Sequence, residues 1–79
     1  MQKLEFELST EYIDLLQLLK ATGIAMSGGE AKMFVNDGCV TVNGKPESRK
    51  RRKLRHGDIV NFDNQVEIAL IKTTIENKS

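Results

Sequence analysis

Seven of the twelve lysine and arginine residues in this 79-residue chain are concentrated in one stretch, residues 45–55, which we call the basic segment. It holds these seven bases and one acid, Glu47, so its formal charge is +6. The rest of the chain has five bases and ten acids, and the net charge of +1 therefore conceals a strong asymmetry. Such a cationic stretch predicts a polyanionic partner. The bases are Lys45, Arg49, Lys50, Arg51, Arg52, Lys53 and Arg55.

The side chains of the basic segment are suited to phosphate, because a planar guanidinium group can donate two parallel hydrogen bonds to it. In a regular strand, alternate side chains would point to opposite faces, and only about half of the bases could meet one partner. We therefore expect an irregular edge or loop that exposes all of them. The alternative is a charged strand edge that prevents aggregation. Six bases in seven positions, from Arg49 to Arg55, repel one another more than that role requires.

The sequence Ser27-Gly28-Gly29-Glu30 marks the start of a predicted helix and offers a second place for an anion. Free backbone amides at a helix start can hold a phosphate, and glycine leaves them accessible. Glu30, however, brings a negative charge to the same end and can itself satisfy an amide in a capping box with Ser27. We therefore favour capping over phosphate binding here. Lys32, one turn into the helix and expected to face outward, is the stronger candidate contact.

The chain offers little for catalysis or metal binding. Its one cysteine, Cys39, excludes a disulfide within the chain and indicates a reducing compartment; we expect it to be a small core residue. The one histidine, His56, has no second histidine or cysteine with which to share a zinc ion. Ser27, His56 and Asp58 could be written as a catalytic triad, but each is better explained as a cap or turn residue. We therefore expect no enzyme, no cofactor, no metal and no small-molecule substrate.

Both helices are expected before residue 38. Residues 3–8 alternate apolar and mostly charged side chains, as a half-buried strand does. Ser9 or Thr10 is the predicted cap of a first helix that ends before Gly23. Ser27 is the predicted cap of a second helix. Apolar positions at helical spacing are expected to face the core: Tyr12, Leu15, Leu16, Leu18, Leu19, Ala31, Phe34 and Val35. The aromatic residues are likewise expected in the core, not in a base-stacking platform: Phe6, Tyr12, Phe34 and Phe62.

After residue 38 the pattern indicates strands, at residues 39–42, 45–48, 59–62 and 66–71. Asn43-Gly44 is a strong hairpin signal. We expect a plain turn there, although Asn43 is also a candidate phosphate contact beside the basic segment. The elements predict an α+β fold of two short helices packed on a small, mainly antiparallel sheet. Residues 1–79 form one domain in this interpretation, with a core over 3–71 and a flexible tail over 72–79.

From Tyr12 to Phe62, about two thirds of the chain, the sequence resembles the S4 domain, the RNA-binding domain named for a ribosomal small-subunit protein. The resemblance is carried by these residues: Ile13-Asp14, Leu18 or Leu19, Gly23, Ser27, Ala31, Phe34, Gly38, Val40, Val42, Asn43-Gly44 and Gly57-Asp58. It is closer to the small stand-alone bacterial proteins of the YaaA-like group, which share the opening of the second helix, residues 27–32, and the basic run, residues 49–54. One departure concerns Gly28, because the broad family usually carries an RNA-contacting arginine there.

The resemblance implies an alpha-L-type RNA-binding fold and structured RNA, ribosomal or tRNA-like, as the partner, with ribosomal subunits during their maturation as the expected setting. We expect such a protein to be monomeric and cytoplasmic. The N-terminus lacks the pattern of a secretion signal, and no apolar stretch approaches the ~18 residues of a membrane span. The bases also avoid the amphipathic helix that membrane-surface binding needs.

Two alternatives stay open. Phosphate contacts alone do not distinguish RNA from DNA, so the preference for RNA comes from the resemblance. The basic segment could also dock on an acidic protein surface, or on the acidic remainder of a second copy of the chain, with no nucleic acid involved.

Overall fold

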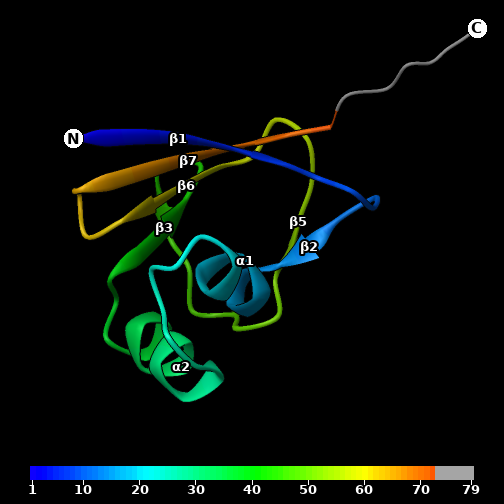
Figure 1. The fold of residues 1–79 in the computed structure, drawn as a ribbon. Coiled ribbons are helices and arrows are strands. Elements are labelled where there is room, and N and C mark those ends of the chain that lie inside the picture. Colours follow the sequence, from blue (N-terminus) through cyan, green and yellow to red (C-terminus); the bar gives the residue numbers. More distant parts are fainter. Residues whose placement is uncertain (73–79) are drawn as a thin grey trace, which may run out of the picture.

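The computed structural model describes residues 1–72 and shows two helices packed on one face of a five-stranded sheet, with a two-stranded ladder beside them (Figure 1). The five-stranded sheet has the order β1-β7-β6-β3-β4. Its strands are β1 (Gln2–Glu7), β3 (Val40–Val42), β4 (Lys45–Pro46), β6 (Ile59–Phe62) and β7 (Val66–Ile71). The ladder joins β2 (Ile13–Asp14) to β5 (Lys53–Leu54), and the helices are α1 (Leu15–Ala21) and α2 (Gly28–Asn36).

The predicted α+β architecture is confirmed. The sheet is antiparallel except for the pair of β1 and β7, which runs parallel with Gln2 opposite Val66 and Glu7 opposite Ile71. Strand alternation sends Leu4 and Phe6 toward the helices, while Lys3 points to the opposite, open face. The predicted tail over 72–79 lies outside the described residues except for Lys72, whose ammonium group contacts Glu11 at 2.9 Å.

The start of α1 differs from the prediction. The cap is Asp14, whose Oδ1 accepts a hydrogen bond from the amide of Gln17 at 2.9 Å, and not Ser9 or Thr10. Aspartate is as good a cap as serine, and here it directly precedes the buried stripe that begins at Leu15. The predicted helical segment upstream of Leu15 instead runs into the ladder with β5, because that pairing satisfies its backbone.

The second helix begins and ends where the sequence indicated. Ser27 caps α2 by accepting a hydrogen bond from the amide of Glu30 at 3.2 Å. The Glu30 carboxylate accepts from the amide of Met26 at 2.6 Å, one residue further back than a standard capping box. Gly38, at φ 77°, follows the C-terminal end. Phe34 packs edge to face on Phe62, with ring centroids 4.9 Å apart.

The predicted hairpins are present. Asn43 and Gly44 both have positive φ, 53° and 84°, which is the conformation that a tight two-residue turn between β3 and β4 needs. Asp63 and Asn64 make the turn between β6 and β7 in the same way, at φ 52° and 56°. Cys39 is partly buried against the core. No helix within residues 1–72 is long and apolar enough to cross a membrane.

Candidate nucleic-acid interface

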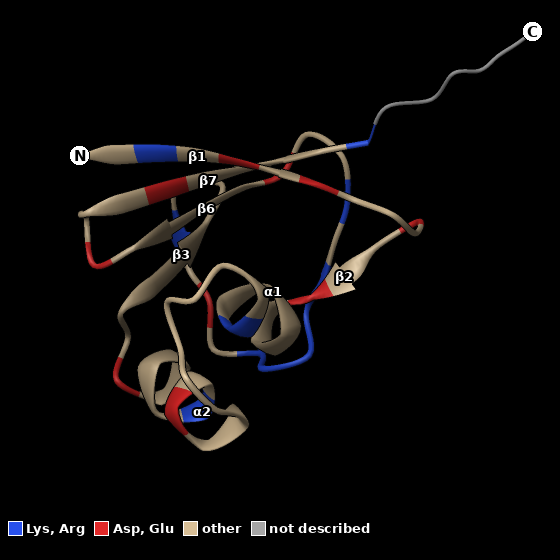
Figure 2. Ribbon diagram, in the orientation of Figure 1, with Lys and Arg blue, Asp and Glu red and all other residues tan. Residues whose placement is uncertain are grey.

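Within the basic segment, residues 47–52 form an irregular loop between β4 and β5, and the backbone of this loop is fixed to α1. The carbonyl oxygen of Arg52 accepts a hydrogen bond from the amide of Leu15 at 3.0 Å, and that of Lys50 accepts from Leu16 at 3.3 Å. These amides belong to the first turn of α1, where no intrahelical acceptor exists. At Lys50 and Arg52 the loop therefore turns its carbonyl oxygens inward. The predicted irregular conformation is confirmed for residues 47–52, whereas Lys45–Pro46 and Lys53–Leu54 lie in strands. In Figure 2 the segment forms a blue stretch that passes below α1 toward β5.

Glu47 holds the middle of this loop in place. Its side chain is only 7% exposed and accepts hydrogen bonds from the Arg49 amide, Nε and Nη2 and from Arg52 Nη1, at 2.7–3.2 Å. Hydrogen bonds from the Arg49 side chain lower the pKa of Glu47 to about 2, against the opposing effect of burial. The carboxylate is thus ionised at neutral pH, and it orders two arginines that would otherwise repel each other.

Most of the cations remain open to solvent despite this internal acid. Arg49 keeps 71% of its side chain exposed, whereas Arg52 is 28% exposed and is the main departure from a loop that exposes every base. Lys50 is half-buried. Within residues 1–72, no carboxylate forms an ion pair with the remaining exposed bases of the segment. These exposed bases are Lys45, Arg51, Lys53 and Arg55.

A hollow of about 530 Å³ lies between the hairpin tip and the loop. Its lining is largely polar: Val42, Asn43, Lys45, Pro46, Glu47, Arg49 and Arg52. The predicted contact Asn43 lies here, but its amide already serves the fold. Its Oδ1 accepts from the amide of Ile59 at 2.9 Å, and its Nδ2 donates to Asp58 at 3.1 Å. Asp58 in turn accepts from the amide of Arg55 at 2.8 Å, which ties the hairpin to the end of the basic segment.

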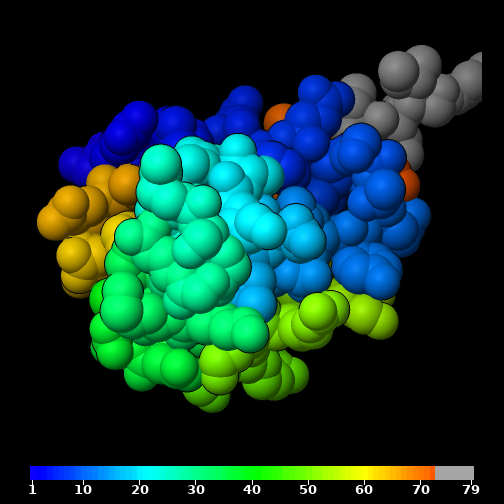
Figure 3. Space-filling model, turned by 60° about the horizontal axis from the view of Figure 1, so that its bottom comes forward, coloured from blue at the N-terminus to red at the C-terminus, as the bar shows by residue number. Residues whose placement is uncertain are grey.

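Helix α2 and the basic segment lie on one face of the molecule (Figure 3). Lys32 is exposed on this helix, as predicted. Ser27 uses its hydroxyl oxygen to cap the helix, and Gly28 and Gly29 leave the space around their Cα atoms almost open. A Cβ atom at Gly28 would meet no atom within 4 Å. Packing therefore does not require glycine at that position.

Tyr12 lies outside the core, and its predicted core position is wrong. It was expected in the core, but it precedes α1, and 42% of it is exposed. The Nζ atom of Lys53 lies 4.9 Å from its ring centroid, and the guanidinium carbon of Arg55 lies 5.7 Å away. The spacing of Tyr12 from Leu15 and Leu19 suggested one helical stripe. Recognising Asp14 as the cap would have placed Tyr12 outside the helix.

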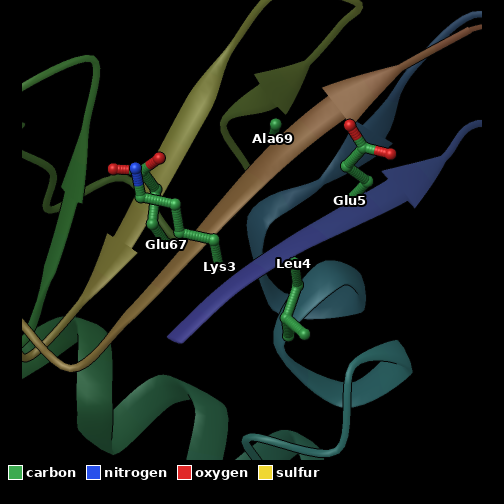
Figure 4. A pocket seen from close by; sticks show the side chains of 5 residues that line it. All are labelled: Lys3, Leu4, Glu5, Glu67 and Ala69. Atoms are coloured by element: carbon green, nitrogen blue, oxygen red, sulfur yellow. The ribbon is translucent and has the colours of Figure 1, made fainter. Parts of the chain in front are cut away.

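The open face of the sheet has the opposite character. A hollow of about 510 Å³ there is lined by Lys3, Leu4, Glu5, Glu67 and Ala69. Figure 4 shows Leu4 directed toward the helices while the other four side chains lie on the outer side. Within residues 1–72, no group of three or more histidine, cysteine or acidic residues is arranged to hold a metal ion. Because Glu5 and Glu67 lie on the open face of the sheet, that face carries acidic side chains, whereas the basic segment carries the cations on the other side of the molecule.

Similar proteins share both the sequence and the fold. The chain is 43% identical over 56 residues to the "Probable ribosome maturation protein RlbA" of Bacillus subtilis (strain 168), an alignment that covers 71% of this chain and 79% of that protein. It is 41% identical over 51 residues to YbcJ of Escherichia coli (strain K12), covering 65% of this chain and 73% of YbcJ.

The fold matches a solved structure of the same kind. The solution structure of YbcJ from E. coli, described as revealing an ALFAL motif involved in RNA binding, aligns with a TM-score of 0.65 and 34% sequence identity over 85% of each chain. The model of the S4 domain matches residues 6–70, which include both helices, the basic segment and most of the sheet. The resemblance to small stand-alone proteins of this type is thereby confirmed, and the chain belongs to the S4 domain family.

Proposed function

We propose that this protein binds structured RNA through the basic segment, without catalysing a reaction on it, and that it acts as a monomer on ribosomal RNA during ribosome maturation in the cytoplasm. The observation that carries the proposal is the anchoring of the loop carbonyls of Arg52 and Lys50 on α1. This anchoring presents the cations of an otherwise acidic domain outward. The described relatives, a ribosome maturation protein and a structure with an RNA-binding motif, support the same function.

The arrangement favours recognition of RNA shape. Side chains cannot easily enter the deep, narrow major groove of A-form RNA. A protein with exposed lysine and arginine side chains on an ordered loop therefore contacts the phosphates and the shallow groove. Lys32 on α2 and the hollow beside Lys45 extend this surface beyond the loop. We place the phosphate contacts on Lys45, Arg49, Arg51, Lys53 and Arg55, with Lys50 and Arg52 supporting the loop at its inner side.

A matched pair of variants tests this function. Arg51→Ala removes an exposed base that pairs with no acid within residues 1–72, and Lys3→Ala removes one from the open face of the sheet. We expect Arg51→Ala to weaken binding to a structured fragment of ribosomal RNA several-fold, and Lys3→Ala to leave it unchanged. Equal effects of the two variants would show that the basic segment is not the contact surface.

The second candidate is docking on an acidic protein surface or on a second copy, because the open sheet face offers Glu5 and Glu67 as a complement to the basic segment. Sedimentation with ribosomal subunits separates the two functions. If RNA is the partner, nuclease treatment releases the protein from the subunits. If the protein instead stays with ribosomal proteins after nuclease treatment, or sediments as a dimer without RNA, the second candidate is correct.

A further inference from the structure

We infer that Tyr12, Asp14, Arg51 and Lys53 form a site for one unpaired nucleobase at the edge of the RNA-binding surface. The inference rests on the proposed function and narrows it, because it specifies that the RNA carries an unpaired nucleotide beside its helix. A base inside a duplex is stacked and paired and cannot reach a side-chain ring without being extruded.

The short ladder between β2 and β5 brings these residues together. Ile13 pairs with Leu54 and Asp14 with Lys53, in antiparallel register. Side chains alternate along a strand, so the fully buried Leu54 and its partner Ile13 face the core. Asp14 and Lys53 therefore face outward, and Tyr12, two residues before Asp14, lies on the same outward side.

Arg51 and Arg55 flank β5 outside the ladder, and both are exposed: Arg51 lines the same hollow as Lys53, and Arg55 lies by the Tyr12 ring. A hollow of about 140 Å³ is lined by Tyr12, Asp14, Arg51 and Lys53. The ring of Tyr12 is partly open, at 42% exposure, and the Lys53 ammonium and the Arg55 guanidinium lie over it, so a stacking base takes a place at the ring that a flexible cationic side chain can vacate. The hydroxyl of Thr10 donates to the carbonyl oxygen of Tyr12 at 2.7 Å and fixes the backbone from which the ring projects. An aromatic ring held at a cationic surface is the arrangement on which nucleobases stack.

The charges around the hollow favour binding of a nucleobase over binding of a phosphate. Asp14 contributes a carboxylate to the wall, where it also caps α1 by accepting from the amide of Gln17. A carboxylate repels phosphate, whereas it accepts hydrogen bonds from the amino and imino groups of a base. Arg51 and Lys53 stand beside it on long stems that can reach the phosphates on either side of that base. The hollow thus combines an aromatic ring for stacking, a hydrogen-bond acceptor and two cationic side chains that can contact phosphates.

Intrinsic fluorescence gives a direct test, because Tyr12 is the chain's only tyrosine and there is no tryptophan. The probe is an RNA hairpin with one bulged adenosine, compared with the fully paired hairpin and with a hairpin that has an abasic site at the bulge. We expect the bulged hairpin to quench the tyrosine emission and the other two to leave it nearly unchanged. Anisotropy of end-labelled RNA reports binding independently.

Two variants separate stacking from folding. Tyr12→Phe keeps the aromatic ring and should retain the preference for the bulged hairpin. Tyr12→Leu should lose it, with affinity for that hairpin falling at least about fivefold, toward that of the paired hairpin. Circular dichroism checks that both variants are folded.

The outcomes distinguish the inference from the proposed function. If all three hairpins bind equally, with unchanged tyrosine emission, the base site is wrong and the proposed function stands. If none of the three hairpins binds, and a structured ribosomal RNA fragment also fails to bind, both the nucleobase site and the proposed function are wrong.

Discussion

The carbonyl oxygen of Arg52 lies 3.0 Å from the amide nitrogen of Leu15, and this hydrogen bond joins the most basic part of the chain to the first turn of α1, a helix whose inner side is buried. The contact uses only backbone atoms, so it restrains the loop without consuming a cationic side chain. Leu15 is fully buried, and the loop is therefore coupled to the core. Binding to a preformed surface avoids much of the entropy that a disordered basic tail loses on association.

The Glu47 carboxylate should make the stability of the protein depend on pH. Its pKa is lowered from 4.5 to about 2 in the folded state, so its stabilisation is fully present above pH 4.5 and is lost as the pH falls toward 2. Because its partner Arg49 is 71% exposed and screened by solvent, we expect this group to contribute about 1–2 kcal/mol to the free energy of unfolding.

Urea unfolding of Glu47→Gln at pH 7 and at pH 2.5 measures this contribution. The variant should be less stable at pH 7, and its deficit should be several-fold smaller at pH 2.5, just above the folded-state pKa of about 2. A Glu5→Gln control on the open face should show no such convergence, and a constant deficit of Glu47→Gln at both pH values would contradict the assignment.

Asn43 should contribute to stability through its side chain as well as its backbone. Asn43→Gly keeps the positive φ of 53° accessible but removes the hydrogen bonds to Ile59 and Asp58. We expect a loss of about 1 kcal/mol in the free energy of unfolding for Asn43→Gly. Asn43→Ala should lose about 1 kcal/mol more, because alanine is strained at positive φ. Equal stabilities of the two variants in thermal unfolding would show that the turn carries no backbone strain.

The partly exposed position of Tyr12 predicts that stability depends little on it. Tyr12→Leu should change the free energy of unfolding by no more than about 1 kcal/mol, because it loses mainly the contacts of the ring with Lys53 and Arg55. Leu15→Ala, three residues along, should cost about 2–5 kcal/mol, because Leu15 is fully buried. Chemical denaturation of both variants checks the boundary between ladder and helix. A large loss in the free energy of unfolding for Tyr12→Leu would show that Tyr12 packs in the core.

Gly28 offers a gain-of-function variant. The S4 domains that the sequence resembles usually carry arginine at this position, and here a Cβ atom would meet no atom within 4 Å. Gly28→Arg should therefore fold normally and strengthen RNA binding several-fold at low salt, with a steeper salt dependence. A matched Gly28→Gln variant separates charge from helix propensity. If the arginine and glutamine variants bind equally, the start of α2 does not contact RNA.

Turns and caps with local signals could be predicted from the sequence. Asn43-Gly44 forms the expected hairpin turn, and Ser27 with Glu30 forms the start of α2, because each depends on neighbours a few residues away. The parallel pairing of β1 with β7 joins the two ends of the described chain and leaves no local signal. Glu47 is a similar case, because a charged residue in a basic run reads as exposed, whereas its burial depends on Arg49 and Arg52 folding over it.

The sequence predicts the cationic residues of the candidate site, but it does not predict that Tyr12 lies beside them. The exposed bases of the basic segment follow from composition and spacing. The position of Tyr12 depends on which residue caps α1, and side-chain type alone does not distinguish Asp14 from Ser9 and Thr10, which also suit a cap. The backbone contacts of Lys50 and Arg52 with α1 have no signature in side-chain types at all.

The most direct measurement is the affinity of a triple variant, Arg51→Ala with Lys53→Ala and Arg55→Ala, for a structured fragment of ribosomal RNA over a range of salt concentrations. These three exposed bases lie outside the Glu47 ion pairs, so the loop should keep its conformation. For the original protein, about five phosphate contacts predict a slope of log K against log salt of roughly −3.5 to −4.5. The triple variant should bind more than about tenfold more weakly at low salt, with a slope shallower by about 2–3. An affinity and slope equal to those of the original protein would contradict RNA binding by the basic segment.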